Sequence, residues 1–248
     1  MRVKRIERNI RVYIIKNCFT SNNLDCPCKM KKLLLSAFVL IVASVTSFPA
    51  VAQEAKGNSL EGEKKVYMCI GCHGILGYHA SFPEVHKVPK LSGQGAKYIA
   101  SALKAYKTGE RKHPTMRGLA DTLNAQDILD VAAYYESSGT SGGGLPKAAD
   151  GSAKAQALVA KGGCVACHGE SFSKPVDPTY PKIAGQHADY LYIALKAYKT
   201  ENNPMVGRSN AIMSAIAKQF SNDELKELAN YVGSLPGELK TVQPDRFR

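Results

Sequence analysis

The pentad Cys-x-x-Cys-His occurs twice in the chain, at positions 69–73 and 164–168. This spacing is the attachment site of c-type haem, where both thiols form thioethers with the vinyl groups of the porphyrin. The adjacent His then reaches the iron from the proximal side. One pentad can arise by chance, but two in similar surroundings predict two covalently bound haem c groups. The predicted haem-binding residues are Cys69, Cys72 and His73 in the first pentad, and Cys164, Cys167 and His168 in the second.

Zinc is the alternative use of these cysteines, because two Cys-x-x-Cys pairs can together bind one structural zinc ion. Here the two pairs are far apart in the chain, and each carries its own adjacent His. This arrangement favours two haem sites over one shared zinc site. A thioredoxin-like redox pair would need a neighbouring strand, and the sequence around the pentads has no strand pattern.

The sequence around the two pentads is duplicated. The heptapeptide Ala-Leu-Lys-Ala-Tyr-Lys-Thr occurs at 102–108 and again at 194–200. The pattern Pro-Lys-[Leu/Ile]-x-Gly-Gln occurs at 89–94 and again at 181–186. The offset between matching residues varies by only a few positions, so the copies differ by small loop changes. Each copy holds one pentad, which predicts two tandem domains of the same fold.

Each copy has the pattern of a helical domain, so we expect an all-α protein. Apolar residues recur with the period of a helix, and no segment shows the strict alternation of a strand. The last helix of the first copy is expected to start at Asn124, with Asp127 three residues on, and that of the second copy at the capping-box pattern of Ser221 and Glu224. The Gly- and Ser-rich segment 141–152 is a predicted linker between domain one, residues 53–140, and domain two, residues 153–248.

The first 52 residues contain a pattern typical of a secretory signal. Two lysines at 31–32 precede an apolar run over 33–45, and Ala-Val-Ala at 50–52 has the small residues of a cleavage site. The apolar run is shorter than the roughly 20 residues that span a bilayer. We therefore expect export to the periplasm and a mature chain that begins at Gln53.

The residues before the signal pattern are unusual, because Met30 stands directly before its two lysines. We interpret Met30 as the true start and residues 1–29 as upstream translation. The alternative is a real and unusually long basic segment ahead of the apolar run.

Removing residues 1–52 changes what the composition implies. This segment holds 9 of the 33 basic and 2 of the 21 acidic residues, so the net charge falls from +12 to +5. No basic stripe with interleaved aromatic residues remains, which argues against a nucleic-acid partner. Three of the seven cysteines also lie in this segment, and the other four belong to the pentads. The exported part therefore has no cysteine left for a disulfide framework.

A haem iron needs either a second axial ligand or an open site, and Met on the distal side suits electron transfer. Met116 lies 12 residues before Ile128 of the last helix in the first copy, and Met213 lies 12 residues before Leu225 in the second. This register predicts Met116 and Met213 as the distal ligands. Met205 lies in an inserted loop and fits no matching position, so we expect it to have a packing or surface role.

Other residues could compete for the distal positions. Met68 directly precedes the first pentad, so it is held near the proximal attachment. Most lone histidines are surface or core residues rather than ligands. The strongest rival is His113, which is three residues from Met116. The remaining histidines outside the pentads are His79, His86 and His187.

Taken together, the two pentads, the Pro-Lys-[Leu/Ile]-x-Gly-Gln segments and the late methionines resemble the dihaem cytochrome c4 family. The resemblance covers essentially all of residues 53–248 and implies two tandem class I cytochrome c domains. It implies that Cys69, Cys72, His73 and Met116 hold one haem, and that Cys164, Cys167, His168 and Met213 hold the other. It also suggests Pro89 and Pro181 as the residues whose carbonyl groups orient the proximal histidines. The chain departs from an ordinary composition in having no Trp, so Tyr and Phe must provide the aromatic packing.

The resemblance also implies a function. Such proteins are periplasmic electron carriers of a respiratory chain, often associated with the outer face of the inner membrane. They pass electrons from a donor reductase towards a terminal oxidase or another reductase, and they have no small-molecule substrate of their own. The alternative is a dihaem subunit of a sulfur-compound-oxidising enzyme, such as a flavocytochrome sulfide dehydrogenase. The Met candidates at both sites favour a carrier over an enzyme, because a catalytic haem needs an open or replaced distal site.

Overall fold

The computed structural model describes residues 55–139 and 151–243 of the chain. The predicted signal segment, the proposed start at Met30 and nearly all of the predicted linker 141–152 lie outside the described residues. None of the helices in the described ranges combines the length and apolar character that a bilayer span requires.

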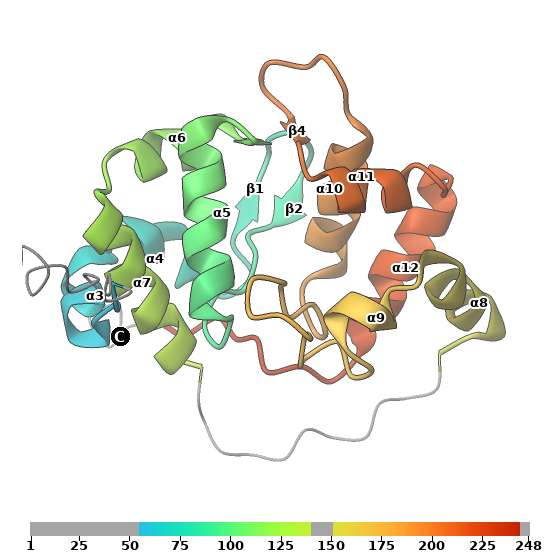
Figure 1. Cartoon of the computed structure of the whole chain (residues 1–248), viewed down its shortest axis with the longest axis horizontal. Helices are drawn as coiled ribbons and strands as arrows, with labels where there is room; N and C mark the ends of the chain where they lie inside the picture. Colours follow the sequence, from blue (N-terminus) through green and yellow to red (C-terminus); the bar gives the residue numbers. More distant parts are fainter. Residues whose placement is uncertain (1–54, 140–150, 244–248) are drawn as a thin grey trace, which may run out of the picture. The chain divides into compact units, whose positions relative to one another are not determined.

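Domain one is mainly helical, as predicted (Figure 1). Its helices are α3 (Ser59–Lys65), α4 (Tyr67–His73), α5 (Ala96–Thr108), α6 (Pro114–Asp121) and α7 (Ala125–Ser137). A short antiparallel ribbon of β1 (His79–Ala80) and β2 (His86–Lys87) lies between α4 and α5. The sequence showed no strand pattern here because strands of two residues are too short to show alternation.

Domain two repeats the helical order of domain one. Its helices are α8 (Ala153–Gly162), α9 (Val165–His168), α10 (Ala188–Lys199), α11 (Ala211–Ala217) and α12 (Asn222–Ser234). Domain two contributes strand β4 (Gly207–Arg208), which pairs antiparallel with β3 (Arg111–Lys112) of domain one. The two domains therefore share one ribbon.

Capping boxes are present at both predicted starts and explain where the last helices begin. In α7 the Asn124 side chain accepts a hydrogen bond from Asp127 N at 2.9 Å, and the Asp127 carboxylate accepts one from Asn124 N at 3.0 Å. In α12 the same exchange joins Ser221 and Glu224 at 3.1 and 2.7 Å. Each exchange satisfies backbone N–H groups that the first turn of a helix leaves without partners.

The core of domain one lies where α3, α4, α5 and α7 meet. Val66, Ile70, Ile99, Ile128 and Val131 are buried together there. Helix α3 approaches α7 very closely, since a Cβ atom on Gly62 would lie 2.0 Å from the Asp130 carbonyl oxygen. Only glycine permits this approach, which holds the N-terminal helix against the last helix of the domain.

The core of domain two is built in the corresponding place. Leu158 of α8 packs with Phe220 and with Leu225 and Leu228 of α12. Leu191 of α10 packs with Ala229 and Val232 on the same helix α12. These apolar residues recur every three or four positions along α12, so one face of this helix is buried while its other side carries charged residues.

Asp130 joins α3 to α7 through a buried ionic network. Its carboxylate accepts hydrogen bonds from Lys65 Nζ at 2.6 Å, from Asn58 N at 2.8 Å and from Gln126 Nε2 at 2.8 Å. Burial opposes ionisation, but these donors outweigh it and lower the pKa of Asp130. Hydrogen bonds to Asp127 and Asp130 raise the pKa of Lys65 to about 12.

We predict that Asp130→Ala destabilises the protein by about 2 kcal/mol at pH 7, because Asn58 N loses its acceptor while Lys65 and Gln126 keep only Asp127 and the Lys56 carbonyl. The native pKa of Asp130 lies below the unfolded value of about 3.9. The stabilisation is therefore complete above that value and is lost as the pH falls through the lower native pKa. Denaturant unfolding of wild type and variant should show a difference that shrinks below about pH 4.

Asp121→Ala is the matched control for this network. The carboxylate of Asp121 is half exposed and forms an ion pair with Arg117 on the surface of α6 at 3.7 Å. Exposed pairs of this kind contribute little to stability, so the control should unfold almost as the wild type does. An equal loss in both variants would contradict a special role for Asp130.

Candidate functional site

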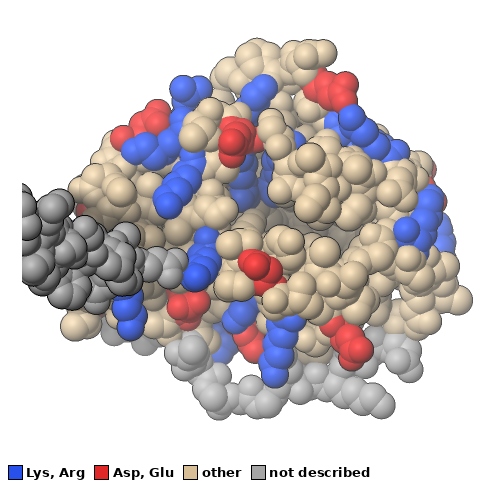
Figure 2. Space-filling view, viewed as in Figure 1, with Lys and Arg blue, Asp and Glu red and all other residues tan. Residues whose placement is uncertain are grey.

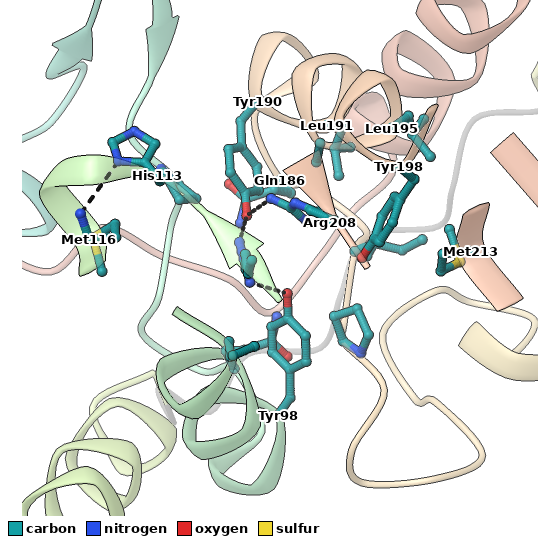
Figure 3. A pocket seen from close by; sticks show the side chains of 18 of the residues that line it. Tyr98, His113, Met116, Gln186, Tyr190, Leu191, Leu195, Tyr198, Arg208 and Met213 are labelled. Atoms are coloured by element: carbon teal, nitrogen blue, oxygen red, sulfur yellow. Dashed lines mark hydrogen bonds between the residues drawn. The ribbon is translucent and has the colours of Figure 1, made fainter. Parts of the chain in front are cut away.

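The residues predicted to bind haem line one cavity of about 700 Å³. The walls are largely apolar, and they come from both domains. The cavity contains Cys69, Cys72, His73 and Met116 of domain one, and Cys164, Cys167, His168 and Met213 of domain two. In the close view of Figure 3, Met116 and Met213 lie on opposite sides of a central group of tyrosines and Arg208.

Helix α4 presents the first pentad to this cavity, and a backbone carbonyl fixes the orientation of its histidine. His73 Nδ1 lies 2.9 Å from the Pro89 carbonyl oxygen. A carbonyl can only accept, so Nδ1 carries the proton and the Nε2 lone pair is left for a metal. Burial lowers the pKa of His73 to about 4, which keeps the ring neutral at physiological pH.

The second pentad has the same arrangement. His168 is the last residue of α9, it is buried, and its Nδ1 lies 3.1 Å from the Pro181 carbonyl oxygen. Burial lowers the pKa of His168. Burial also raises the pKa of the Cys69 thiol to about 11 and that of Cys164 in the same direction. The two prolines suggested by the resemblance therefore lie at equivalent places, although they follow their histidines at different distances in the sequence.

Both predicted methionine ligands lie on short helices. Met116 is the third residue of α6, and Met213 is the third residue of α11. The helices form because a side chain caps each N-terminus: His113 Nδ1 accepts from Met116 N at 3.4 Å, and Asn210 Oδ1 accepts from Met213 N at 2.9 Å. The equivalent capped position is an independent reason to treat the two methionines as a pair.

The competing residues differ from the predicted ligands in exposure or hydrogen bonding, although Met68, His79, His86 and His113 also line the cavity. Met205 is 49% exposed and is absent from the cavity lining. His113 uses Nδ1 as the helix cap, and the buried His86 stacks on Tyr190 with Nδ1 2.8 Å from the Glu84 carbonyl oxygen. Met68 lines the cavity near the first pentad and receives a weak hydrogen bond from Thr122 at 3.8 Å.

A group of arginines and tyrosines at the centre of the cavity was missed in the sequence. Tyr190 OH accepts from Arg111 at 2.6 Å and from Arg208 at 3.2 Å, and Arg111 also donates to Tyr98 at 3.3 Å. Burial opposes the effect, but the two guanidinium groups lower the pKa of Tyr190 to about 8. The sequence could have pointed to the two arginines, because Arg111 and Arg208 each stand five residues before the predicted methionine ligand of their domain.

These surroundings fit haem rather than a bare metal ion. The cavity is large and apolar, its histidines have Nε2 available, and thiols stand beside them. The buried Nε of Arg111 has no hydrogen-bond partner among the described residues, which suits a site that receives a carboxylate such as a haem propionate. Within residues 55–139 and 151–243, no cluster of three or more His, Cys, Asp or Glu side chains could hold a metal ion.

Comparison with known proteins agrees with this geometry. The family model of cytochrome c matches residues 60–138 and 152–236, one match in each domain. Cytochrome c4 of Pseudomonas aeruginosa is 31% identical over 215 residues, which cover 83% of this chain and 100% of the relative. This chain belongs to the cytochrome c4 family. The prediction of two tandem cytochrome c domains is therefore confirmed, and the chain carries two covalently bound haem c groups.

Two further similarities bear on structure and function. The crystal structure of reduced recombinant cytochrome c4 from Pseudomonas stutzeri is 29% identical and has a TM-score of 0.53, covering 72% of this chain and 99% of that chain. The thiosulfate dehydrogenase electron acceptor of Stutzerimonas stutzeri is 31% identical over 190 residues, covering 71% of this chain and 82% of the relative. Membership of the cytochrome c4 family makes the chain a c-type electron-transfer cytochrome.

Proposed function

We propose that this protein is a periplasmic electron carrier in which both haem irons have one His and one Met ligand. The observation that carries the proposal is the repetition of one arrangement in both domains. Each domain places a carbonyl-oriented histidine and a methionine from the third position of a capped helix along the same cavity. We assign His73 and Met116 to one haem, and His168 and Met213 to the other.

Different residues of the chain would attach the haems, orient their histidine ligands and shield them from water. The cysteines Cys69, Cys72, Cys164 and Cys167 form the thioethers, while the carbonyl groups of Pro89 and Pro181 keep Nδ1 of each histidine protonated. The haem groups supply reversible one-electron chemistry, and His/Met ligation favours a raised potential. The apolar walls would exclude water from the bound haems, and His73, Met116, His168 and Met213 would hold the irons in both oxidation states.

The partners we propose are redox proteins rather than small molecules. Basic and acidic side chains are interspersed over the face shown in Figure 2, so this face offers no single-sign patch for a strongly charged polymer. The similarity to a thiosulfate dehydrogenase electron acceptor favours a sulfur-compound dehydrogenase as one donor. The proposed acceptor is a terminal oxidase or another reductase at the outer face of the inner membrane.

We predict that the purified mature protein contains two low-spin, six-coordinate haems. A spectroscopic redox titration should give two one-electron steps, and the reduced protein should not bind carbon monoxide readily at neutral pH, because Met occupies each sixth position. Ready binding of carbon monoxide by either haem would show an open site. Such a result would support the enzyme alternative over the carrier.

A further inference from the structure

The duplicated pattern of the two repeats ends in a glutamine that reaches the other domain. Gln94 and Gln186 close the duplicated Pro-Lys-[Leu/Ile]-x-Gly-Gln segments, and they are only 4% and 5% exposed. A buried amide is costly unless its donor and acceptor groups are satisfied. In this protein each amide is satisfied mainly by the backbone of the opposite domain.

The contacts are reciprocal and nearly identical in length. Gln186 Oε1 accepts from Lys90 N at 3.0 Å, and Gln186 Nε2 donates to the Lys90 carbonyl at 3.0 Å. Gln94 Oε1 accepts from Lys182 N at 2.9 Å, and Gln94 Nε2 donates to the Lys182 carbonyl at 2.9 Å. Figure 3 includes Gln186 among the side chains that line the cavity.

Each glutamine acts on a peptide group that also holds a proximal histidine. The carbonyl of Pro89 and the N–H of Lys90 belong to one peptide group. The carbonyl faces His73 Nδ1 at 2.9 Å, while the N–H donates to Gln186. The Pro181–Lys182 peptide group joins His168 Nδ1 to Gln94 in the same way. A single peptide group therefore connects each histidine to a side chain of the other domain.

Hydrogen bonds in such a chain strengthen one another. An acceptor on the N–H side of a peptide group increases the electron density on its carbonyl oxygen. The carbonyl then accepts more strongly from the histidine Nδ1–H, which raises the basicity of Nε2. A more basic ligand stabilises Fe(III) relative to Fe(II), so the contact lowers the reduction potential of the haem on the far side of the domain boundary.

We propose that Gln186 and Gln94 are crossed positioning residues, each tuning the proximal ligand of the haem in the other domain. Gln186 of domain two acts on His73, and Gln94 of domain one acts on His168. The reduction potential of each haem therefore depends on the contact between the two domains. This inference rests on the proposed function, because it requires both histidines to be iron ligands.

The test is a pair of variants of the full-length holoprotein, Gln186→Leu and Gln94→Leu. The readout is the Nδ1–H resonance of each proximal histidine, observed by ¹H–¹⁵N NMR of the reduced protein with ¹⁵N-labelled histidine. We expect Gln186→Leu to shift the His73 proton upfield and leave His168 near its wild-type position. We expect Gln94→Leu to do the reverse. A redox titration should show one raised potential in each variant.

Asp189→Ala is the matched control for general weakening of the domain boundary. Asp189 Oδ2 accepts from Lys87 N of domain one at 2.9 Å, and it touches neither Pro-Lys peptide group. The control should move neither histidine proton. Docking should survive in the glutamine variants, because Lys90 Nζ still donates to the Gly185 carbonyl at 2.6 Å and β3 still pairs with β4.

The outcomes separate the two proposals. If wild type shows two low-spin haems but each variant moves only the histidine of its own domain, or moves neither, the crossed coupling is wrong. An equal shift in Asp189→Ala would also overturn it, since any loosening of the boundary would then suffice. If the wild-type spectra show no Met-ligated haem, the proposed function itself fails before the variants are considered.

Discussion

Met213→Ala is expected to remove the Met–iron charge-transfer absorption of one haem and to lower its reduction potential. The thioether is the ligand that favours Fe(II), so its loss shifts the equilibrium towards Fe(III). Met213 occupies the third position of α11 and lines the cavity. Absorption spectra of the oxidised protein and a redox titration would measure both effects, and the second haem should keep its band.

Met205→Ala is the control for this prediction, because the same domain offers a second methionine. Its side chain is 49% exposed and its backbone N–H is bonded to Asn203 Oδ1 at 2.9 Å in the loop before β4. Its truncation should leave both haem spectra nearly unchanged. Loss of the band in Met205→Ala, with its retention in Met213→Ala, would show that the loop insertion in domain two changes the ligand register.

The residues with local or repeated signals could be predicted from the sequence. The pentads identify the haem attachment, and the capping boxes at Asn124 and Ser221 locate the last helices. Comparing the two copies predicted that Met116 and Met213 occupy matching positions. It did not predict the short helices α6 and α11 that carry them. Their N-caps, His113 and Asn210, lack the acidic partner three residues on that makes a capping box recognisable.

The features that were not predicted depend on contacts between residues far apart in the chain. Gln186 lies 96 positions from Lys90, and Arg111 lies 79 positions from Tyr190. Periodicity reports which face of a helix is buried, but not which polar groups meet at a domain boundary. Such residues look like ordinary surface side chains until the fold brings them together.

The unequal spacing of the two prolines has a structural cause. Pro89 follows His73 by 16 positions and Pro181 follows His168 by 13. The ribbon of β1 and β2 occupies this stretch in domain one, whereas the described residues between His168 and Pro181 form turns. The ribbon contacts α10 of domain two, with Lys87 N donating to Asp189. The extra residues therefore build part of the domain boundary and leave the carbonyl in place.

The double substitution Cys69→Ala with Cys72→Ala is expected to prevent attachment of one haem and to unfold much of domain one. The haem groups fill a largely apolar cavity of about 700 Å³, and apolar walls without atoms between them lose their packing contacts. A typical domain is stable by only about 5–15 kcal/mol. Loss of this packing would remove a large part of that small stability, so we expect the domain to lose its native fold without haem.

Mass spectrometry should show one haem fewer in this variant, and far-ultraviolet circular dichroism should show a large loss of helix. Cys164→Ala with Cys167→Ala is the matched variant in domain two, where Leu191, Leu225 and Leu228 line the same cavity. Each variant should keep the absorption spectrum of the haem in its intact domain. A variant domain that lost its haem but still unfolded cooperatively, with full helix content, would show that side chains of the core suffice. The domain would then fold without haem, and haem would not be a necessary part of its core.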